Sequence, residues 1–187
     1  SVPPHRIRVP LLLGGPHAEA LKPRLDGLGF AATVGALKLG VASYSLRKFP
    51  FDKALEMAQA CAVRYINFKD VHLPRTDPPE AIKAARARTE AAGLTIMGGG
   101  TITWVQKGPA WQPSDTEQVR NDFEYAKLAG MPLIVAAPSF EALDTVEKTA
   151  KEFGIKVAIH NHGPEDKFFP SPYDVYKHVK GRDKHMG

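Results

Sequence analysis

From about Lys38 onward, short apolar runs alternate with amphipathic helical segments, and this repeat constrains the fold more than any other feature. Within the helical segments apolar residues recur at three- and four-residue spacing, and a glycine commonly follows the segment. Such a βα repeat predicts parallel strands, because parallel neighbours need a long crossover connection that a helix supplies. The sequence therefore indicates an α/β fold whose helices cover a parallel sheet, either as a barrel or as an open doubly wound sheet.

The repeat contains five units. The expected strands cover residues 39–44, 65–68, 94–97, 132–137 and 155–160. The expected helices cover residues 51–62, 79–92 and 115–129, a segment between the N-cap Ser139 and Gly154, and a segment from the N-cap Ser171 to about residue 179. A complete eightfold barrel needs about 250 residues, so this chain is short for one. An open five-stranded sheet fits the length, but the glycine fingerprint of dinucleotide-binding sheets is absent after the first strand.

Three consecutive glycines, Gly98–Gly100, follow the third expected strand and lead into a loop with Trp104 and Trp111. Their spacing matches neither the dinucleotide fingerprint nor the phosphate loop. We expect a flexible or closely approached strand end here, and a cradle for a substrate phosphate is the alternative.

Composition indicates one globular domain, since 43% of the residues are hydrophobic and 24% are charged. The net charge of +5 is too diffuse to indicate nucleic acid, and no apolar run approaches the roughly 18 residues of a membrane span. We therefore expect no nucleic-acid partner, no membrane partner and a cytoplasmic location. The single cysteine, Cys61, lies among Ala and Met residues, which predicts a small buried apolar side chain.

Residues 1–37 stand apart from the repeat because proline and glycine interrupt them. We expect an N-terminal arm, extended or with a short helix over residues 18–28, beside a domain formed by residues 38–187. The alternative is the remnant of a leader and export to the periplasm. The apolar patch at residues 11–13 is, however, shorter than the roughly seven to fifteen residues of a secretion signal.

The ends of the expected strands supply the candidate site, since functional side chains of parallel α/β domains gather there. His160 and His162 are two residues apart at the end of the fifth strand, which places them on one face about 6 to 7 Å apart at the backbone. Neutral imidazoles bind Zn, Mn or Fe and also transfer protons near neutral pH. The alternative is that both rings hydrogen-bond the backbone as the chain turns at Gly163.

Other strand ends offer possible substrate contacts, each with a plainer alternative. We expect His72 to contact substrate. Lys69 either contacts substrate or forms a local ion pair with Asp70. Arg47 would hold an anionic group of the substrate or remain a solvated charge. Trp104, together with the second loop tryptophan, would form an apolar wall over a sugar ring or be buried against the rim of the domain.

Three of these stretches resemble the sugar phosphate isomerase/epimerase family, whose fold is the xylose-isomerase-like TIM barrel. They are Leu39–Arg47 (LGVASYSLR), Lys69–Pro74 (KDVHLP) and Val157–Gly163 (VAIHNHG). The resemblance implies an incomplete barrel of this type, with about five of its eight βα units. It implies a divalent metal, Mn, Zn, Mg or Co, at the mouth of the barrel and proton transfer between adjacent carbons of a sugar.

In residue terms, the resemblance implies that His160 and His162 act as catalytic and metal-binding groups. It assigns substrate binding to the strand-end residues Tyr44, Arg47, Lys69, His72, Trp104 and Asn161. His160 stands where better-known isomerases carry a glutamate ligand, which is a departure from the family pattern. The further acidic and histidine ligands of the family come from strands six to eight, which would follow Gly187.

The expected function is a metal-dependent isomerase or epimerase of a sugar, sugar phosphate or keto-sugar. The alternatives are a lyase or hydrolase on the same scaffold and a non-catalytic carbohydrate-binding or assembly fragment. Residues 184–187 run into the position of a sixth strand. We therefore expect a longer parent chain. The alternatives are a homo-oligomer that covers the open edge of the barrel and a reduced protein without a complete metal site.

Overall fold

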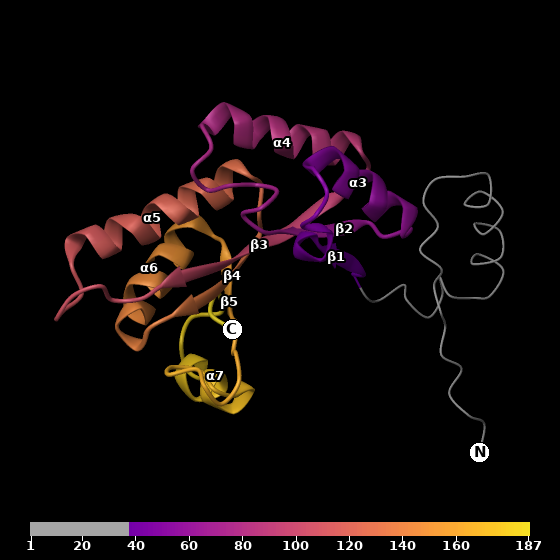
Figure 1. The fold of residues 1–187 in the computed structure, drawn as a ribbon. Helices are drawn as coiled ribbons and strands as arrows, with labels where there is room; N and C mark the ends of the chain where they lie inside the picture. Colours follow the sequence, from indigo (N-terminus) through magenta and orange to yellow (C-terminus); the bar gives the residue numbers. More distant parts are fainter. Residues whose placement is uncertain (1–37) are drawn as a thin grey trace, which may run out of the picture. The chain divides into compact units, whose positions relative to one another are not determined.

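Five parallel strands form one sheet in the computed structural model, which describes residues 38–187 (Figure 1). The strands are β1 (Gly40–Ala42), β2 (Tyr65–Phe68), β3 (Thr95–Trp104), β4 (Leu133–Pro138) and β5 (Lys156–Ile159). The helices are α3 (Phe51–Ala60), α4 (Pro79–Ala91), α5 (Pro113–Leu128), α6 (Leu143–Phe153) and α7 (Pro172–Val179), with 3₁₀ turns at Ser43–Leu46 and Phe140–Ala142. The predicted arm or leader, residues 1–37, lies outside the described residues.

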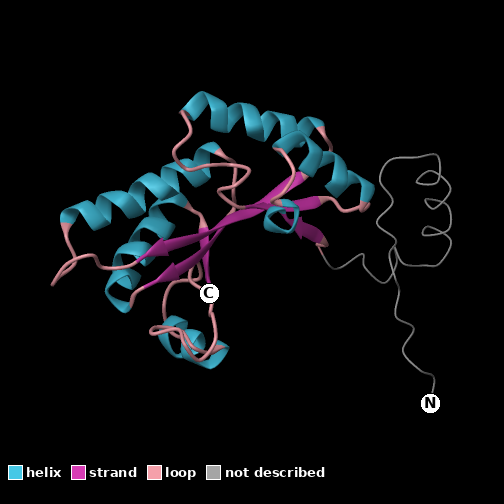
Figure 2. Ribbon diagram, in the orientation of Figure 1, coloured by secondary structure: helices cyan, strands magenta, loops and turns pink. Residues whose placement is uncertain are grey.

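The order of the strands in the sheet is β1-β2-β3-β4-β5, and each neighbouring pair is parallel (Figure 2). A doubly wound sheet reverses its strand order at a switch point, and this sheet does not. Because parallel crossovers have one hand, a sequential order places the successive helices on the same face. In agreement, α4 packs against α5 and α5 packs against α6. The arrangement is that of a partial barrel and not of a doubly wound sheet.

Burial alternates along the strands, as a barrel wall with one covered face requires. In β2 the side chains of Ile66 and Phe68 are buried, whereas Tyr65 and Asn67 are half-buried. Strand β4 shows the same alternation over its whole length. The covered face meets aromatic side chains of the helices, since Trp104 stacks on Phe123 with ring centroids 5.7 Å apart.

The predicted glycine segment is strand and not loop. Gly98 and Gly99 pair with β2, and a side chain at Gly98 would place its Cβ 2.7 Å from the carbonyl oxygen of Leu133 on the opposite side. The expectation of a closely approached strand is confirmed, because neighbouring backbones occupy the space that side chains would need. The prediction that Trp104 lies on a loop is wrong, since it is the last residue of β3.

Helix termini follow the capping signals with one exception. Ser171 caps α7 as predicted, with its hydroxyl accepting from the backbone N–H of Asp174. Ser139 instead precedes a 3₁₀ turn and makes no side-chain cap, so α6 begins four residues later, at Leu143. The expectation that Cys61 is buried is wrong: α3 ends at Ala60, and Cys61 follows it as an exposed residue beyond the buried helix face.

The last described residues pair with the edge of the sheet. Met186 forms a parallel bridge with Val157, whose N–H donates to the carbonyl of His185 at 2.7 Å. The backbone N–H of Gly187 donates to the carbonyl of Val157 at 2.9 Å. These bonds agree with the predicted position of a sixth strand. Among residues 38–187, no helix combines the length and the hydropathy needed to cross a membrane.

Candidate active site at the strand ends

The two histidines that follow β5 lie together. A backbone hydrogen bond from the N–H of His160 to the carbonyl of Ala136, 2.8 Å long, holds the end of this strand against β4. The rings of His160 and His162 have centroids 4.5 Å apart and stand edge to face, with 82° between their planes. Asn161 between them is half-buried. The pair that was predicted from the two-residue spacing is therefore present, although it lies just beyond the strand.

Asp166 fixes the orientation of His162. Its Oδ2 lies 2.9 Å from Nδ1 of His162, and its Oδ1 accepts from the backbone N–H groups of Phe168 and Phe169 at 2.8 and 3.0 Å. Burial alone would raise the pKa of this carboxyl, but the hydrogen bonds from Phe169, His162 and Phe168 lower it to about 2. Since a carboxylate accepts only, Nδ1 of the neutral His162 ring carries the proton and Nε2 carries the lone pair.

Lys69, the residue after β2, brings a positive charge to the same site. Its Nζ donates to Oγ1 of Thr101 on β3 at 2.8 Å, and its backbone N–H donates to Oγ of Ser43 at 2.9 Å. Burial lowers the pKa of His160, and the nearby charges of His162 and Lys69 lower it further against the opposing effect of Asp166. The His160 ring is therefore a neutral base at pH 7.

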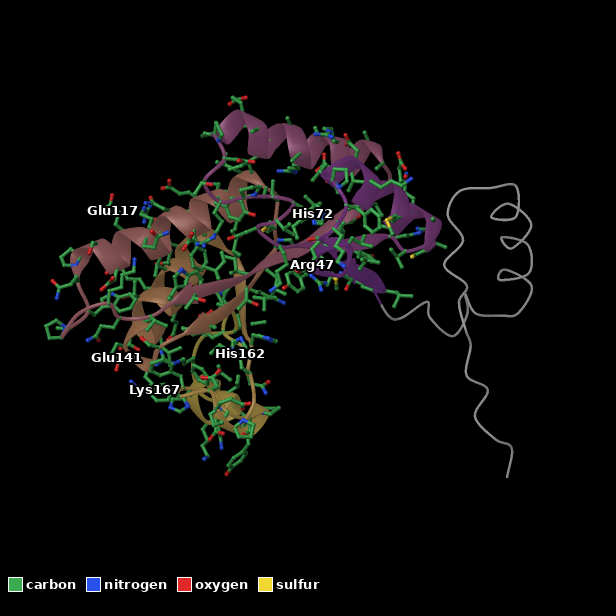
Figure 3. All side chains as sticks on the ribbon, in the orientation of Figure 1. Arg47, His72, Glu117, Glu141, His162 and Lys167 are labelled. Carbon is green, nitrogen blue, oxygen red and sulfur yellow. The ribbon has the colours of Figure 1, made fainter. Side chains whose placement is uncertain are left out.

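A cavity of about 360 Å³ opens beside His162, within the roughly 300 to 1,000 Å³ typical of small-molecule sites. It lies between the ends of β3 and β4 and the segment that follows β5. Figure 3 shows His162 and Lys167 on the side of the sheet where α7 lies. The lining includes Thr103, Ala137, His162, Asp166 and Phe168. Through this cavity a small molecule can reach His162.

The donor set does not by itself hold a metal ion. No group of three or more His, Cys, Asp or Glu side chains within residues 38–187 has the arrangement of a metal site. Catalytic zinc sites use three protein ligands, and the two histidines supply two imidazoles without a carboxylate ligand. The predicted divalent metal therefore stays a prediction.

Other predicted site residues lie away from His162 or make contacts that hold the fold together. Arg47 donates to the backbone carbonyl of Tyr44 and lies over its ring, 4.6 Å from the centroid, so these two side chains contact each other. His72 is only 6% exposed, and its Nε2 lies 2.9 Å from the carbonyl oxygen of Phe49. This bond ties the loop after β2 to the start of α3. Arg47 and His72 lie toward the β1 side of the sheet, apart from His162 (Figure 3).

Trp104 lines a different cavity from the one beside His162. Its Nε1 donates to Oδ2 of Asp122 on α5 at 2.8 Å, and Arg75 donates to the other oxygen of Asp122 at 2.8 Å. Sequence reasoning missed Arg75, Asp122 and Asp166. The sequence did contain a clue to Asp122, which is a charged residue at a core-facing position of its helix. No sequence pattern pointed to Asp166 as the partner of His162, because the segment between them is not helical and a spacing of four residues predicts no contact there.

Comparison with known proteins gives a fold and no sequence relative. Neither a family model nor a curated protein matches this sequence. An uncharacterised protein from Parabacteroides distasonis superposes with a TM-score of 0.65 and 21% identity over 80% of this chain and 61% of its own. A D-psicose 3-epimerase crystallised with D-fructose gives a TM-score of 0.59 at 12% identity, over 73% of this chain and 56% of its own.

A third structure is a fusion of a xylose isomerase-like TIM barrel with a 4-hydroxyphenylpyruvate dioxygenase. Its TM-score is 0.53 at 10% identity, over 67% of this chain and 22% of its own. The chain thus spans about three-fifths of the first structure and less of the other two. The predicted fold class is confirmed: residues 40–187 have the fold of part of a xylose-isomerase-like TIM barrel.

Proposed function

We propose that this chain belongs to a sugar isomerase that moves a proton between adjacent carbons, with His160 as the base. The observation that carries the proposal is the histidine pair just beyond β5, with His162 oriented by Asp166. A base must be unprotonated at the working pH, and the lowered pKa of His160 keeps its ring unprotonated near pH 7. The structural likeness to a D-psicose 3-epimerase supports the substrate class.

The proposed step begins at a C–H bond next to the carbonyl of an open-chain sugar. His160 takes the proton onto a ring nitrogen, and the electron pair of the broken C–H bond forms a carbon–carbon double bond. The carbonyl oxygen becomes an enolate oxygen, whose charge the ammonium group of Lys69 would balance. The protonated His160 then returns the proton to the former carbonyl carbon. The hydroxyl proton on the adjacent carbon moves to the enolate oxygen, so the carbonyl forms at that adjacent carbon.

The placement of the histidines favours isomerisation over epimerisation. An enzyme that inverts one carbon with two side chains needs a base on one face of the substrate and an acid on the opposite face. His160 and His162 have ring centroids 4.5 Å apart and so approach a substrate from one side. One base can move a proton between adjacent carbons on one face, so this pair fits isomerisation. Within this scheme, Nε2 of His162 would exchange the hydroxyl proton of the substrate.

The test is deuterium exchange into D-fructose and D-psicose in heavy water, measured by ¹H NMR with and without added Mn²⁺. We expect deuterium at C1 and the appearance of an aldose. His160→Gln should lower the exchange rate by about 10² to 10⁴-fold, the range for loss of a general base. Lys148→Gln, a change at an exposed residue of α6, serves as the matched control and should leave the rate unchanged.

Other results would select the other functions. Deuterium at C3 with a new ketose and no aldose would indicate epimerisation. A product of different mass without exchange would indicate a lyase or hydrolase. Sugar binding without exchange or a change of mass, in this chain and in a longer parent, would contradict catalysis.

A further inference from the structure

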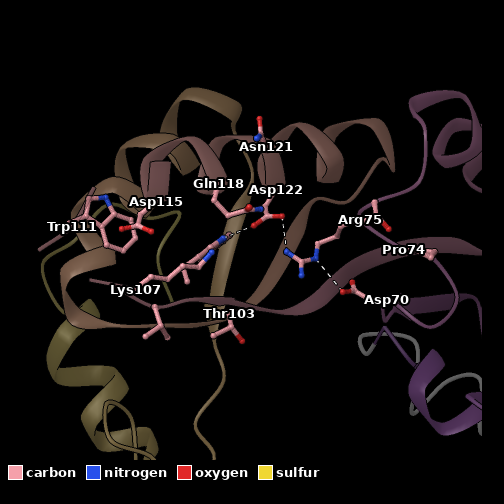
Figure 4. Close-up of a pocket in the computed structure, with 13 residues that line it drawn as sticks. Asp70, Pro74, Arg75, Thr103, Lys107, Trp111, Asp115, Gln118, Asn121 and Asp122 are labelled. Carbon is pink, nitrogen blue, oxygen red and sulfur yellow. Dashed lines mark hydrogen bonds and ion pairs between the residues drawn. The ribbon is translucent and has the colours of Figure 1, made fainter. Parts of the chain in front are cut away.

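A second cavity, of about 570 Å³, lies between α5 and the segments that follow β2 and β3 (Figure 4). It shares only Thr103 and Val105 with the cavity beside His162. All of its walls come from residues 70–122, which form consecutive elements of the described chain. Its volume falls in the range of small-molecule sites.

The helix that forms one wall carries polar residues where a core helix carries apolar ones. Asp115, Gln118 and Asp122 are spaced three and four residues apart on α5, so they lie along one face of this helix. Asp122 is 2% exposed and Asp115 is 7% exposed. Burying carboxylates costs free energy unless hydrogen bonds compensate, and both have such bonds. This face of the helix is therefore built to keep polar groups in place.

The charges in the cavity nearly cancel. Arg75 donates to Asp122 at 2.8 Å and to Asp70 at 3.2 Å, and Figure 4 shows it between the two. Lys107 and Asp115 supply one further charge of each sign. A cavity with three carboxylates and two cations offers no concentrated positive charge for a phosphate. It also offers no group of three metal-binding side chains. These charges favour a neutral ligand.

The remaining lining combines indole rings with amide and hydroxyl groups. Trp104 and Trp111 line the cavity, and hydrogen bonds from their Nε1 atoms to Asp122 and Thr116 fix both rings. Trp104 is 2% exposed and stacks on Phe123, so the half-buried ring of Trp111 is the indole face that a ligand contacts. The exposed amides of Gln118 and Asn121 and the hydroxyl of Thr103 supply donors and acceptors.

Sugars and polyols carry hydroxyl groups that bind amides and carboxylates, together with C–H faces that pack on indoles. We propose that the cavity between α5 and the ends of β2 and β3 is a second binding site, which takes a neutral sugar or polyol. The inference does not depend on the proposed isomerase activity, because it uses neither His160 nor His162.

The experiment uses the tryptophan fluorescence of the whole chain. The chain has two tryptophans, and both line this cavity, so a change in indole emission reports on this site. D-fructose, D-glucose and myo-inositol are titrated as neutral probes, and inorganic phosphate as an anionic probe. We expect a saturable change in emission with at least one neutral probe and none with phosphate.

Variants then locate the binding. The double variant Gln118→Ala/Asn121→Ala should weaken binding by about tenfold or more, because it removes about two hydrogen bonds to the ligand. Glu117→Ala is the matched control, since Glu117 is exposed on the same helix and does not line the cavity (Figure 3). Far-UV circular dichroism checks that each variant is folded. The apparent Kd should stay within about twofold in Glu117→Ala and in His160→Gln.

Three results would overturn the proposal. The first is the absence of a saturable change with every neutral probe. The second is a response to phosphate in place of the neutral probes, which would show that the cavity selects an anion. The third is loss of binding in His160→Gln with retention in the double variant, which would place the ligand at the histidine site. The deuterium-exchange test is independent of all three.

Discussion

Replacing Asp166 with asparagine tests the hydrogen-bond network that orients His162. In the native chain the Asp166 carboxylate accepts from one imidazole and two backbone N–H groups. The pKa of this carboxyl falls from 3.8 to about 2 on folding, which corresponds to about 2 kcal/mol of stability. Its side chain remains 12% exposed, so solvent screening reduces this figure. We expect Asp166→Asn to lower the free energy of unfolding by about 1 to 2 kcal/mol at pH 7.

The sign of the pH dependence follows from the depressed pKa. A carboxyl that ionises more easily in the folded state stabilises the fold above its unfolded pKa, near 3.8, and loses this contribution as the pH falls toward 2. The difference between native chain and variant should therefore shrink between pH 4 and 2. Urea unfolding followed by circular dichroism measures it. Glu117→Gln, an exposed change on α5, is the control.

The same variant gives a second readout at His162. In the native chain Nδ1 carries the proton of the neutral ring, and ¹⁵N NMR distinguishes this tautomer from the one protonated at Nε2. We expect the tautomer population to shift in Asp166→Asn, because the side-chain amide no longer requires a donor at Nδ1. A stability difference that does not change between pH 7 and 2, or an unchanged tautomer, would refute the role assigned to Asp166.

Three further predictions test the site and its support. Lys69→Met should lower the rate of deuterium exchange into substrate by about 10² to 10³-fold with little change in circular dichroism, because it removes the charge that balances the enolate. Gly98→Ala should destabilise the fold by about 1 to 3 kcal/mol in urea, because the new Cβ would lie 2.7 Å from the carbonyl oxygen of Leu133. Tyr125→Phe should cost about 1 to 3 kcal/mol in the same assay, since the Tyr125 hydroxyl donates to the buried carbonyl of Leu73 at 2.8 Å. Unchanged exchange in the first variant, or unchanged urea midpoints in the others, would contradict these expectations.

The sequence predicted the elements of the fold with errors mainly at their ends. Apolar spacing placed α4 and β2 within one residue of their observed bounds, and the capping signal at Ser171 placed the start of α7. These features are local, because a helix face and a cap depend on residues within a few positions of one another. The pairing of His160 with His162 was predictable for the same reason.

The tertiary structure decided what depends on residues far apart in the sequence. The strand order, which separates a barrel from a doubly wound sheet, is set by packing between whole βα units. The strand character of Gly98 appeared only when the backbone of β4 was seen to occupy the space of its missing side chain.

The partners of the candidate site also required the tertiary structure. Asp166 reaches His162 through an irregular turn, and Lys69 comes to the histidines from a strand about ninety residues earlier in the chain. Asp122 on α5 meets Arg75 from the loop after β2 and Trp104 from the end of β3. The sequence by itself determined the βα units and the histidine pair, because periodicity and spacing are local. Which side chains meet across the sheet was decided by folding, since those contacts follow from strand order and register.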